Sequence, residues 1–169
     1  AAPLRPINAQ AETVATKAMF RDATRRRRCL LPADGFYEWH RLSATARQAF
    51  DIHLRGSRPF YFAGIFGPPA ADQPPGCAIL TTRANARVAA VHLRMPVMLE
   101  GEAAQKWLAA AAPDPSTLAT LAVPPAAEDV ELVPVSSRVN SPAHDDPTCL
   151  DPVSLTPTST PPKQGLLFE

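Results

Sequence analysis

The stretch that most constrains this chain is the nonapeptide Leu31-Pro32-Ala33-Asp34-Gly35-Phe36-Tyr37-Glu38-Trp39. Pro followed by Asp-Gly is a turn signal, and the aromatic run behind it favours a loop that leads into a β-strand. Because successive side chains of a strand point to opposite faces, Glu38 shares a face with Phe36. Burial among rings would raise the pKa of this carboxyl into the range suited to proton transfer. A surface Glu on a half-exposed strand is the alternative for this stretch taken alone.

Two further motifs accompany the nonapeptide, namely Asn8 within Ile7-Asn8-Ala9-Gln10-Ala11-Glu12-Thr13 and the pentapeptide His92-Leu93-Arg94-Met95-Pro96. In their order and spacing the three motifs resemble the SOS response-associated peptidase (SRAP) family, whose members process abasic sites in single-stranded DNA. The resemblance runs from about residue 7 to residue 107 and resumes over residues 139–142 and 145–147. Three separated motifs in register are more specific than any one of them.

Length and composition predict one mixed α+β domain. The chain has 169 residues, enough for a real core. We expect an SRAP-like domain over residues 1–150, with a curved antiparallel sheet forming an open barrel and helices outside it. From residue 151 the chain is rich in Pro, Ser and Thr, which predicts a flexible tail over residues 151–169.

Several classes of protein are disfavoured. No apolar run approaches the roughly 20 residues that span a bilayer, and no signal peptide opens the chain. Three widely spaced cysteines suggest neither a disulfide framework nor a zinc site, and a reducing cytoplasm fits best. Asp145-Asp146 in a Pro-bounded loop is typical of a turn rather than of a metal site. No metal or cofactor is expected.

The net charge of +1 conceals a division along the chain. Residues 1–96 hold 14 Lys and Arg against 6 Asp and Glu, a net +8, whereas residues 97–169 hold 3 against 10, a net −7. A basic first part is the electrostatic footprint of a phosphate-binding surface. The run Arg25-Arg26-Arg27-Arg28 alone is more simply a solvated helix end.

Hydrophobic periodicity predicts a helix over residues 11–23 and an amphipathic helix over residues 100–112 that buries Trp107 and Leu108. A shorter helix to Leu121 could be capped by Ser116. Strands are predicted over residues 29–31, 50–54, 60–66, 77–82 and 129–135, the third of them central. A further strand is expected to begin at His92. His53 falls on the polar side of its strand, where we expect solvent exposure.

Asn8, Gln10, His92 and Arg94 are the remaining candidates for a site. Asn8 could be a helix N-cap, or its amide could contact a sugar. Family members usually carry Arg where this chain has Gln10, which keeps a hydrogen bond to DNA but loses the charge. Alternation along a strand would place His92 and Arg94 on one face. An imidazole, a group suited to proton transfer near neutral pH, would then lie beside a guanidinium suited to binding a phosphate.

The resemblance implies a specific chemistry. An abasic sugar opens to an aldehyde, which the family's N-terminal Cys captures as a Schiff base and then as a thiazolidine. Glu38 would move protons during capture, and His92 would act as acid and base for ring opening. Asn8 would orient the sugar, while Arg94 and Thr81 would hold flanking phosphates. An unpaired strand can be kinked so that the lesion enters a pocket.

The nucleophile itself is not expected among these residues. Family members carry an upstream segment beginning Met-Cys-Gly-Arg, and the printed sequence begins at Ala1 with none of it. We therefore expect an SRAP-like domain without its N-terminal segment. Two alternatives stay open, a non-catalytic single-stranded DNA-binding module and the thiol autopeptidase of the family's name.

The chain ends Lys163-Gln164-Gly165-Leu166-Leu167-Phe168-Glu169. Gln followed by an apolar cluster resembles the peptide that bacterial replication proteins insert into the sliding clamp. Gln164, Leu167 and Phe168 would then bind the clamp. The alternative is a tail that packs on its own domain.

Overall fold

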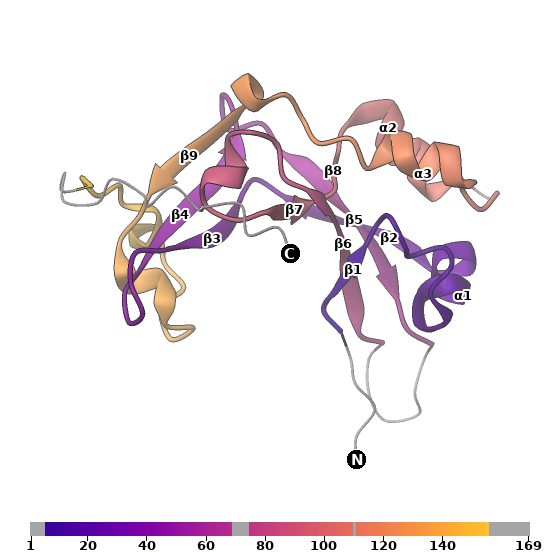
Figure 1. Cartoon of the computed structure of the whole chain (residues 1–169), viewed down its shortest axis with the longest axis horizontal. Helices are drawn as coiled ribbons and strands as arrows, with labels where there is room; N and C mark the ends of the chain where they lie inside the picture. Colours follow the sequence, from indigo (N-terminus) through magenta and orange to yellow (C-terminus); the bar gives the residue numbers. More distant parts are fainter. Residues whose placement is uncertain (1–5, 69–74, 110, 156–169) are drawn as a thin grey trace, which may run out of the picture.

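Two sheets and three α-helices make up the fold. The computed structural model describes residues 6–68, 75–109 and 111–155 (Figure 1). The six-stranded sheet contains β1 (Asn8–Gln10), β2 (Arg28–Ala33), β5 (Phe60–Phe66), β6 (Cys77–Arg83), β7 (Arg94–Pro96) and β8 (Met98–Leu99). The three-stranded sheet contains β3 (Phe36–Arg41), β4 (Arg47–Leu54) and β9 (Val130–Pro134). The α-helices are α1 (Ala18–Arg26), α2 (Gly101–Leu108) and α3 (Pro115–Leu121).

The strand β5 lies at the centre, as its apolar sequence predicts. It pairs antiparallel with β2, β6 and β8, and five of its seven residues are buried, while Tyr61 is exposed. The mixed α+β class is confirmed. No ladder joins the two sheets within the described residues, so the strands form an open arrangement. One pair departs from the antiparallel expectation, because β1 runs parallel to β6.

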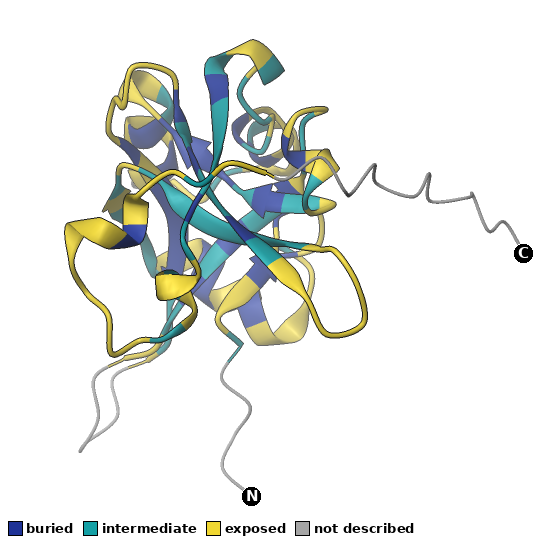
Figure 2. Ribbon diagram, turned by 90° about the vertical axis from the view of Figure 1, so that its left-hand side faces the viewer, coloured by how far each residue is buried: buried dark blue, intermediate teal, exposed yellow. Residues whose placement is uncertain are grey.

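Two apolar clusters fill the interior. One lies where α1, α2 and α3 cover the six-stranded sheet, with Trp107 and Val14 fully buried in it. The other joins residues of both sheets, including Ile52 and Leu54 of β4 and Phe60 and Phe62 of β5. Buried residues concentrate on the inner strands and exposed ones on the connecting loops (Figure 2). None of the helices in the described ranges has the length and apolar character needed to cross a membrane.

The first helix begins later than predicted. Residues 11–16 form turns, and α1 starts at Ala18. The reason is pairing with a strand distant in sequence, because the Ala11 N–H donates to the Thr81 carbonyl at 2.9 Å and so continues the contact between β1 and β6. Val14 is buried in this turn region, and Thr24 Oγ1 donates to its carbonyl at 3.3 Å.

The other predicted elements are present with shifted ends. The strands over residues 50–54, 60–66, 77–82 and 129–135 correspond to β4, β5, β6 and β9. The strand predicted over residues 29–31 is β2, which continues to Ala33. The turn before β3 therefore consists of Asp34 and Gly35 alone, and Pro32 belongs to the strand. The helix expected over residues 100–112 ends at Leu108, which is exposed rather than buried. The cap of α3 is Asp114, not Ser116.

His53 is not exposed, contrary to the expectation. Its side chain is only 15% exposed, and both ring nitrogens face carboxylates. Nδ1 lies 2.8 Å from Asp51 Oδ2 and Nε2 lies 3.3 Å from Glu131 Oε2. The partner on β9 lies far away in sequence, so strand alternation alone could not reveal it.

The last described residues remain attached to the domain. Val135 and Pro152 form a bridge, and the Val153 N–H donates to the Pro134 carbonyl at 2.9 Å. Gln164, Leu167 and Phe168 lie outside the described residues.

The arginine run is only partly a solvated helix end. Arg28 begins β2, and its guanidinium donates to main-chain oxygens of α1 and of the end of α2. These include Trp107 O at 2.8 Å, Thr24 O at 2.8 Å and Arg25 O at 2.7 Å, and Ala109 O is a further acceptor. Arg28 therefore fastens the two helices to the sheet.

We predict that Arg28→Ala lowers the free energy of unfolding by about 2 kcal/mol, because several charge-assisted hydrogen bonds to main-chain oxygens are lost. Urea denaturation would measure the change. Arg26→Ala is the matched control, since Arg26 pairs with Asp22 on the exposed surface at 3.3 Å. That control should cost less than about 0.5 kcal/mol. Equal losses in both variants would contradict the fastening role of Arg28.

Candidate functional site

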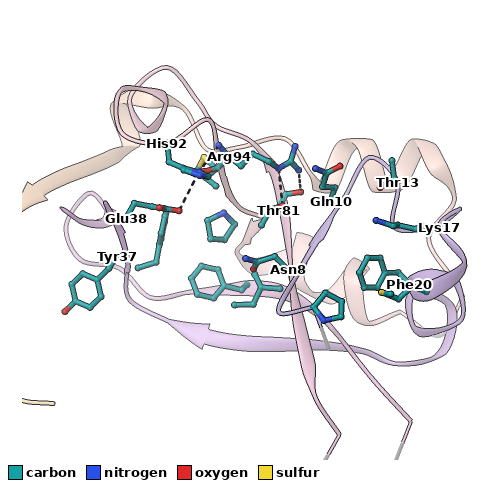
Figure 3. Close-up of a pocket in the computed structure, with 17 residues that line it drawn as sticks. Asn8, Gln10, Thr13, Lys17, Phe20, Tyr37, Glu38, Thr81, His92 and Arg94 are labelled. Atoms are coloured by element: carbon teal, nitrogen blue, oxygen red, sulfur yellow. Dashed lines mark hydrogen bonds and ion pairs between the residues drawn. The ribbon is translucent and has the colours of Figure 1, made fainter. Parts of the chain in front are cut away.

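A single groove holds the side chains from all three sequence motifs. It has a volume of about 610 Å³ and is lined by Glu38 of β3, Asn8 and Gln10 of β1, Thr81 of β6, and His92 and Arg94 at β7 (Figure 3). Thr13, Lys17 and Phe20 line its other end. Asn8 and Arg94, which are 86 positions apart in the sequence, thus share one surface.

Strand pairing explains why these residues meet. Gln10 lies opposite Thr81 in the parallel pair of β1 and β6, and Arg83 lies opposite Arg94 in the antiparallel pair of β6 and β7. Ala9 is buried on the core side, so Asn8 and Gln10 face the groove. Asn8 is not a helix cap, because the cap position of α1 is Lys17.

Glu38 and His92 are neighbours in this groove. His92 Nδ1 lies 3.8 Å from Glu38 Oε1, and the two side chains are 52% and 25% exposed, respectively. Burial raises the pKa of Glu38, because the charged form loses hydration, while His92 and a hydrogen bond from the Trp39 N–H partly offset this effect. The pKa of this carboxyl therefore lies nearer to neutral pH than the pKa of an ordinary Glu.

A backbone contact orients the imidazole of His92. Nδ1 lies 2.9 Å from the Arg94 carbonyl oxygen and 3.2 Å from the Arg94 main-chain nitrogen. A protonated Nδ1 donates to the carbonyl and an unprotonated Nδ1 accepts from the N–H, so the main chain of Arg94 holds the ring in either tautomer. His92 precedes β7 instead of beginning a strand, so this local contact, and not strand alternation, places it beside Arg94.

Arg94 is held on two sides. Nε donates to Thr81 Oγ1 at 3.2 Å, and Nη2 donates to the Thr81 carbonyl at 2.6 Å. On the other side Nη1 and Nη2 donate to the two carboxylate oxygens of Glu12 at 3.1 and 2.8 Å. The hydrogen bond from Arg94 is the main cause that lowers the pKa of Glu12, and burial partly opposes it.

Sequence reasoning missed Glu12, Thr13 and Lys17 as groove or groove-edge residues. Glu12 stands two positions after Gln10 in the first motif, so the motif itself contained the signal. Lys17 gave no signal, because it was expected inside a helix and is instead the residue that precedes one. Its ammonium lies 5.7 Å from the centre of the Phe20 ring and supplies a cation at the far end of the groove.

The aromatic residues around Glu38 are divided between two environments. Phe36 packs edge-on against Phe62 with ring centres 6.1 Å apart, and both rings line the groove. Tyr37 points away from His92 at the rim (Figure 3). Trp39 donates from Nε1 to Asn140 Oδ1 at 2.6 Å. This hydrogen bond connects β3 to residues 139–142, the stretch where the resemblance to the family resumes.

Neither the cysteines nor the paired aspartates contribute to the groove. Cys29 and Cys77 contact each other with their sulfur atoms 3.6 Å apart, and Cys149 is buried elsewhere. Asp146 caps a short helix through the Thr148 N–H at 3.0 Å and pairs with Arg138 at 2.7 Å. No cluster of three or more His, Cys, Asp or Glu suited to a metal ion occurs in the described part of the chain.

We predict that Glu38→Gln raises the stability of the fold at pH 7, by about 1 kcal/mol, because a partly buried charge is replaced by a neutral amide. Since the native pKa of Glu38 is raised, the wild type is penalised only when this group is ionised. The gain in stability should therefore shrink as the pH falls through the pKa of Glu38 in the folded protein. It should be absent below the pKa of Glu38 in the unfolded chain. Thermal unfolding across pH 3.5 to 8 would measure it.

The matched control for that series is Glu102→Gln, which neutralises an exposed carboxylate on α2. This variant should show little change at any pH. A Glu38→Gln protein that is less stable than wild type at pH 7 would contradict the cost assigned to burying the carboxylate.

Comparison with known proteins adds the following findings. The profile described as "SOS response associated peptidase (SRAP)" matches residues 1–142. "Abasic site processing protein YoqW" of Bacillus subtilis is 39% identical over 148 residues, which cover 86% of this chain and 66% of that protein. "Abasic site processing protein HMCES" of Gallus gallus is 33% identical over 171 residues, covering 88% of this chain and 50% of that protein.

Solved structures share the fold. A Bacteroides thetaiotaomicron protein matches with a TM-score of 0.74 at 24% identity, over 87% of this chain and 66% of that one. A phage-related protein of Bordetella bronchiseptica matches with a TM-score of 0.65 at 31% identity, over 77% of this chain and 63% of that one. The chain thus spans just under two thirds of the length of the bacterial relative and half that of the vertebrate one.

Proposed function

This chain belongs to the SOS response-associated peptidase family, and on that premise we propose that it recognises abasic sites in single-stranded DNA during DNA repair. The curated relatives are named abasic site processing proteins, which supports this assignment. One observation carries the proposal furthest, namely that Glu38 and His92 approach to 3.8 Å in a groove that also contains Asn8, Thr81 and Arg94.

The pair suits the opening of an abasic sugar. The closed sugar is a hemiacetal, and opening it moves a proton from the hydroxyl to the ring oxygen while the carbon–oxygen bond of the ring breaks. His92, held at Nδ1 by the main chain of Arg94, acts as the acid and base of this step. Glu38, with its raised pKa, exchanges protons with the opened sugar. Asn8 orients the sugar through its amide.

The flanking groups hold the strand. Arg94 and Thr81 bind phosphates beside the lesion, and Gln10 adds a neutral hydrogen bond. Phosphate contacts fix the position of the strand without reading its sequence. Single-stranded DNA is the proposed substrate form, because an unpaired backbone bends into a groove at lower cost.

Covalent shielding is the proposed outcome when a Cys is the N-terminal residue of the chain, as in the family. Its amine condenses with the aldehyde to a Schiff base and releases one water. The thiol then adds across the carbon–nitrogen bond, its proton passes to nitrogen, and a thiazolidine forms. Neither Cys29, Cys77 nor Cys149 lines the groove, so none of them replaces this nucleophile. The groove residues described above supply recognition and proton transfer in this proposal.

Docking of Gln164, Leu167 and Phe168 on the replication sliding clamp is proposed from the sequence alone. Such docking would bring the domain to replication forks, where single-stranded DNA is exposed.

The test is a gel assay with a single-stranded oligonucleotide that carries one abasic site, beside the same oligonucleotide intact. We predict a salt-sensitive shift for the printed chain with at least about tenfold preference for the abasic strand, the equivalent of one hydrogen bond to a charged group. A chain with Cys as its first residue should give a band that resists denaturant. Self-cleavage without DNA would instead indicate a peptidase.

His92→Asn and His144→Asn form the matched pair in this assay. Both imidazoles are exposed, and each has Nδ1 2.9 Å from a main-chain oxygen, but only His92 lines the groove. Loss of a general acid–base group should slow crosslinking in the Cys-first chain by about 100-fold in His92→Asn alone. Equal affinity for abasic and intact strands, or equal effects of the two substitutions, would overturn the proposal.

A further inference from the structure

We propose that in the free protein the Glu12 carboxylate occupies the place on the Arg94 guanidinium where a DNA phosphate binds. Glu12 must then leave Arg94 when DNA binds. The inference rests on the proposed function, because it assumes that Arg94 binds a backbone phosphate. It assigns to Glu12 the role of a positioning residue that sets the affinity and salt dependence of the groove.

The contact has the geometry that a phosphate would adopt. Both carboxylate oxygens of Glu12 accept from the terminal nitrogens of Arg94, at 3.1 and 2.8 Å. Paired parallel hydrogen bonds of this kind are the usual way in which a guanidinium binds a carboxylate or a phosphate. Glu12 therefore fills the side of the fork that a phosphate would use.

The other side of the fork is not free. Nε donates to Thr81 Oγ1 and Nη2 donates to the Thr81 carbonyl. Four of the five N–H groups of Arg94 are then engaged, and one N–H of Nη1 remains. A phosphate can form a two-point contact with this guanidinium only by taking the place of Glu12.

Charge leads to the same conclusion. The Glu12–Arg94 pair is neutral as a whole, and Gln10 beside it is uncharged, so Arg94 itself attracts a phosphate only weakly while the pair is closed. Glu12 is 49% exposed and lies in the turn region ahead of α1, whereas Arg94 is 28% exposed and anchored on Thr81. The carboxylate is thus the partner that moves.

The released carboxylate keeps a cationic neighbour. Arg83, opposite Arg94 in the strand pair, is close enough to Glu12 to lower the pKa of its carboxyl. Turning toward Arg83 limits the cost of leaving Arg94. Each group thus has two possible partners: Arg94 binds either Glu12 or a phosphate, and Glu12 pairs with either Arg94 or Arg83. The exchange is therefore reversible.

The experiment compares wild type, Glu12→Gln and the control Glu102→Gln for binding to an unmodified oligo-dT at several salt concentrations. Gln keeps the size of Glu but not its charge. Glu12→Gln should bind about fivefold more tightly at low salt, since one Coulomb contact no longer has to be broken. The slope of log K against log salt should steepen by up to about 0.7, because in the wild type salt also weakens the Glu12–Arg94 pair and so offsets the counterion release at this phosphate. Glu102→Gln should change neither quantity, because its partner is Lys106 on α2.

A second measurement follows Glu12 in the wild-type protein. Its carboxyl pKa, measured by NMR, should rise toward the ordinary Glu value when oligo-dT saturates the groove, because a phosphate has replaced Glu12 as the partner of Arg94. A merely structural ion pair would keep its lowered pKa. In an Arg94→Gln background, the effect of Glu12→Gln on affinity should disappear.

The outcomes separate the two proposals. Arg94-dependent binding with an unchanged or weaker Glu12→Gln protein, an unchanged salt slope, or a Glu12 pKa that stays low would overturn the exchange and leave the proposed function standing. Failure of wild type and Glu12→Gln to bind any single-stranded DNA would overturn both.

Discussion

The pairing of β6 with β1 on one side and β7 on another is the constraint on which the site depends. A three-residue strand such as β1 has little stability of its own, and its register is fixed by Asn8 opposite Ile79 and Gln10 opposite Thr81. The same strand β6 supplies Thr81, which holds Arg94 from β7. A slip of one residue would turn Asn8 and Gln10 toward the core and Ala9 toward the groove.

The second support is the close packing over β5. A Cβ atom on Gly64 would lie 2.4 Å from Leu31 Cδ1 and 2.9 Å from Cys29 Sγ, so a larger residue at position 64 would displace these side chains of the paired strand β2. β2 leads through the Asp34-Gly35 turn into β3, which carries Glu38. Gly35 is tight as well, with Asp51 Oδ1 at 2.9 Å from a Cβ built on it. The pairing of β2 with β5 and the tight turn at Gly35 thus set where β3 and the carboxylate of Glu38 lie.

The features that sequence could predict are those carried by local periodicity. Alternation identified β4, and the apolar run over residues 60–66 identified β5 as central. The errors arise where a distant partner decides. His53 is covered because Glu131 faces it across β9, and the turns before α1 form because Ala11 pairs with Thr81. Glu12 escaped notice because its role exists only through Arg94, 82 positions away. The roles of Glu38, His92 and Asn8 came from the family motifs, and they remain proposals.

The decisive measurement is a crystal structure of the chain with a single-stranded oligonucleotide that contains a tetrahydrofuran abasic analogue. We expect the analogue sugar to lie within about 3.2 Å of Glu38, His92 or Asn8, with an adjoining phosphate on Arg94. A strand bound on the helical side of the six-stranded sheet, with the groove free of DNA, would contradict it.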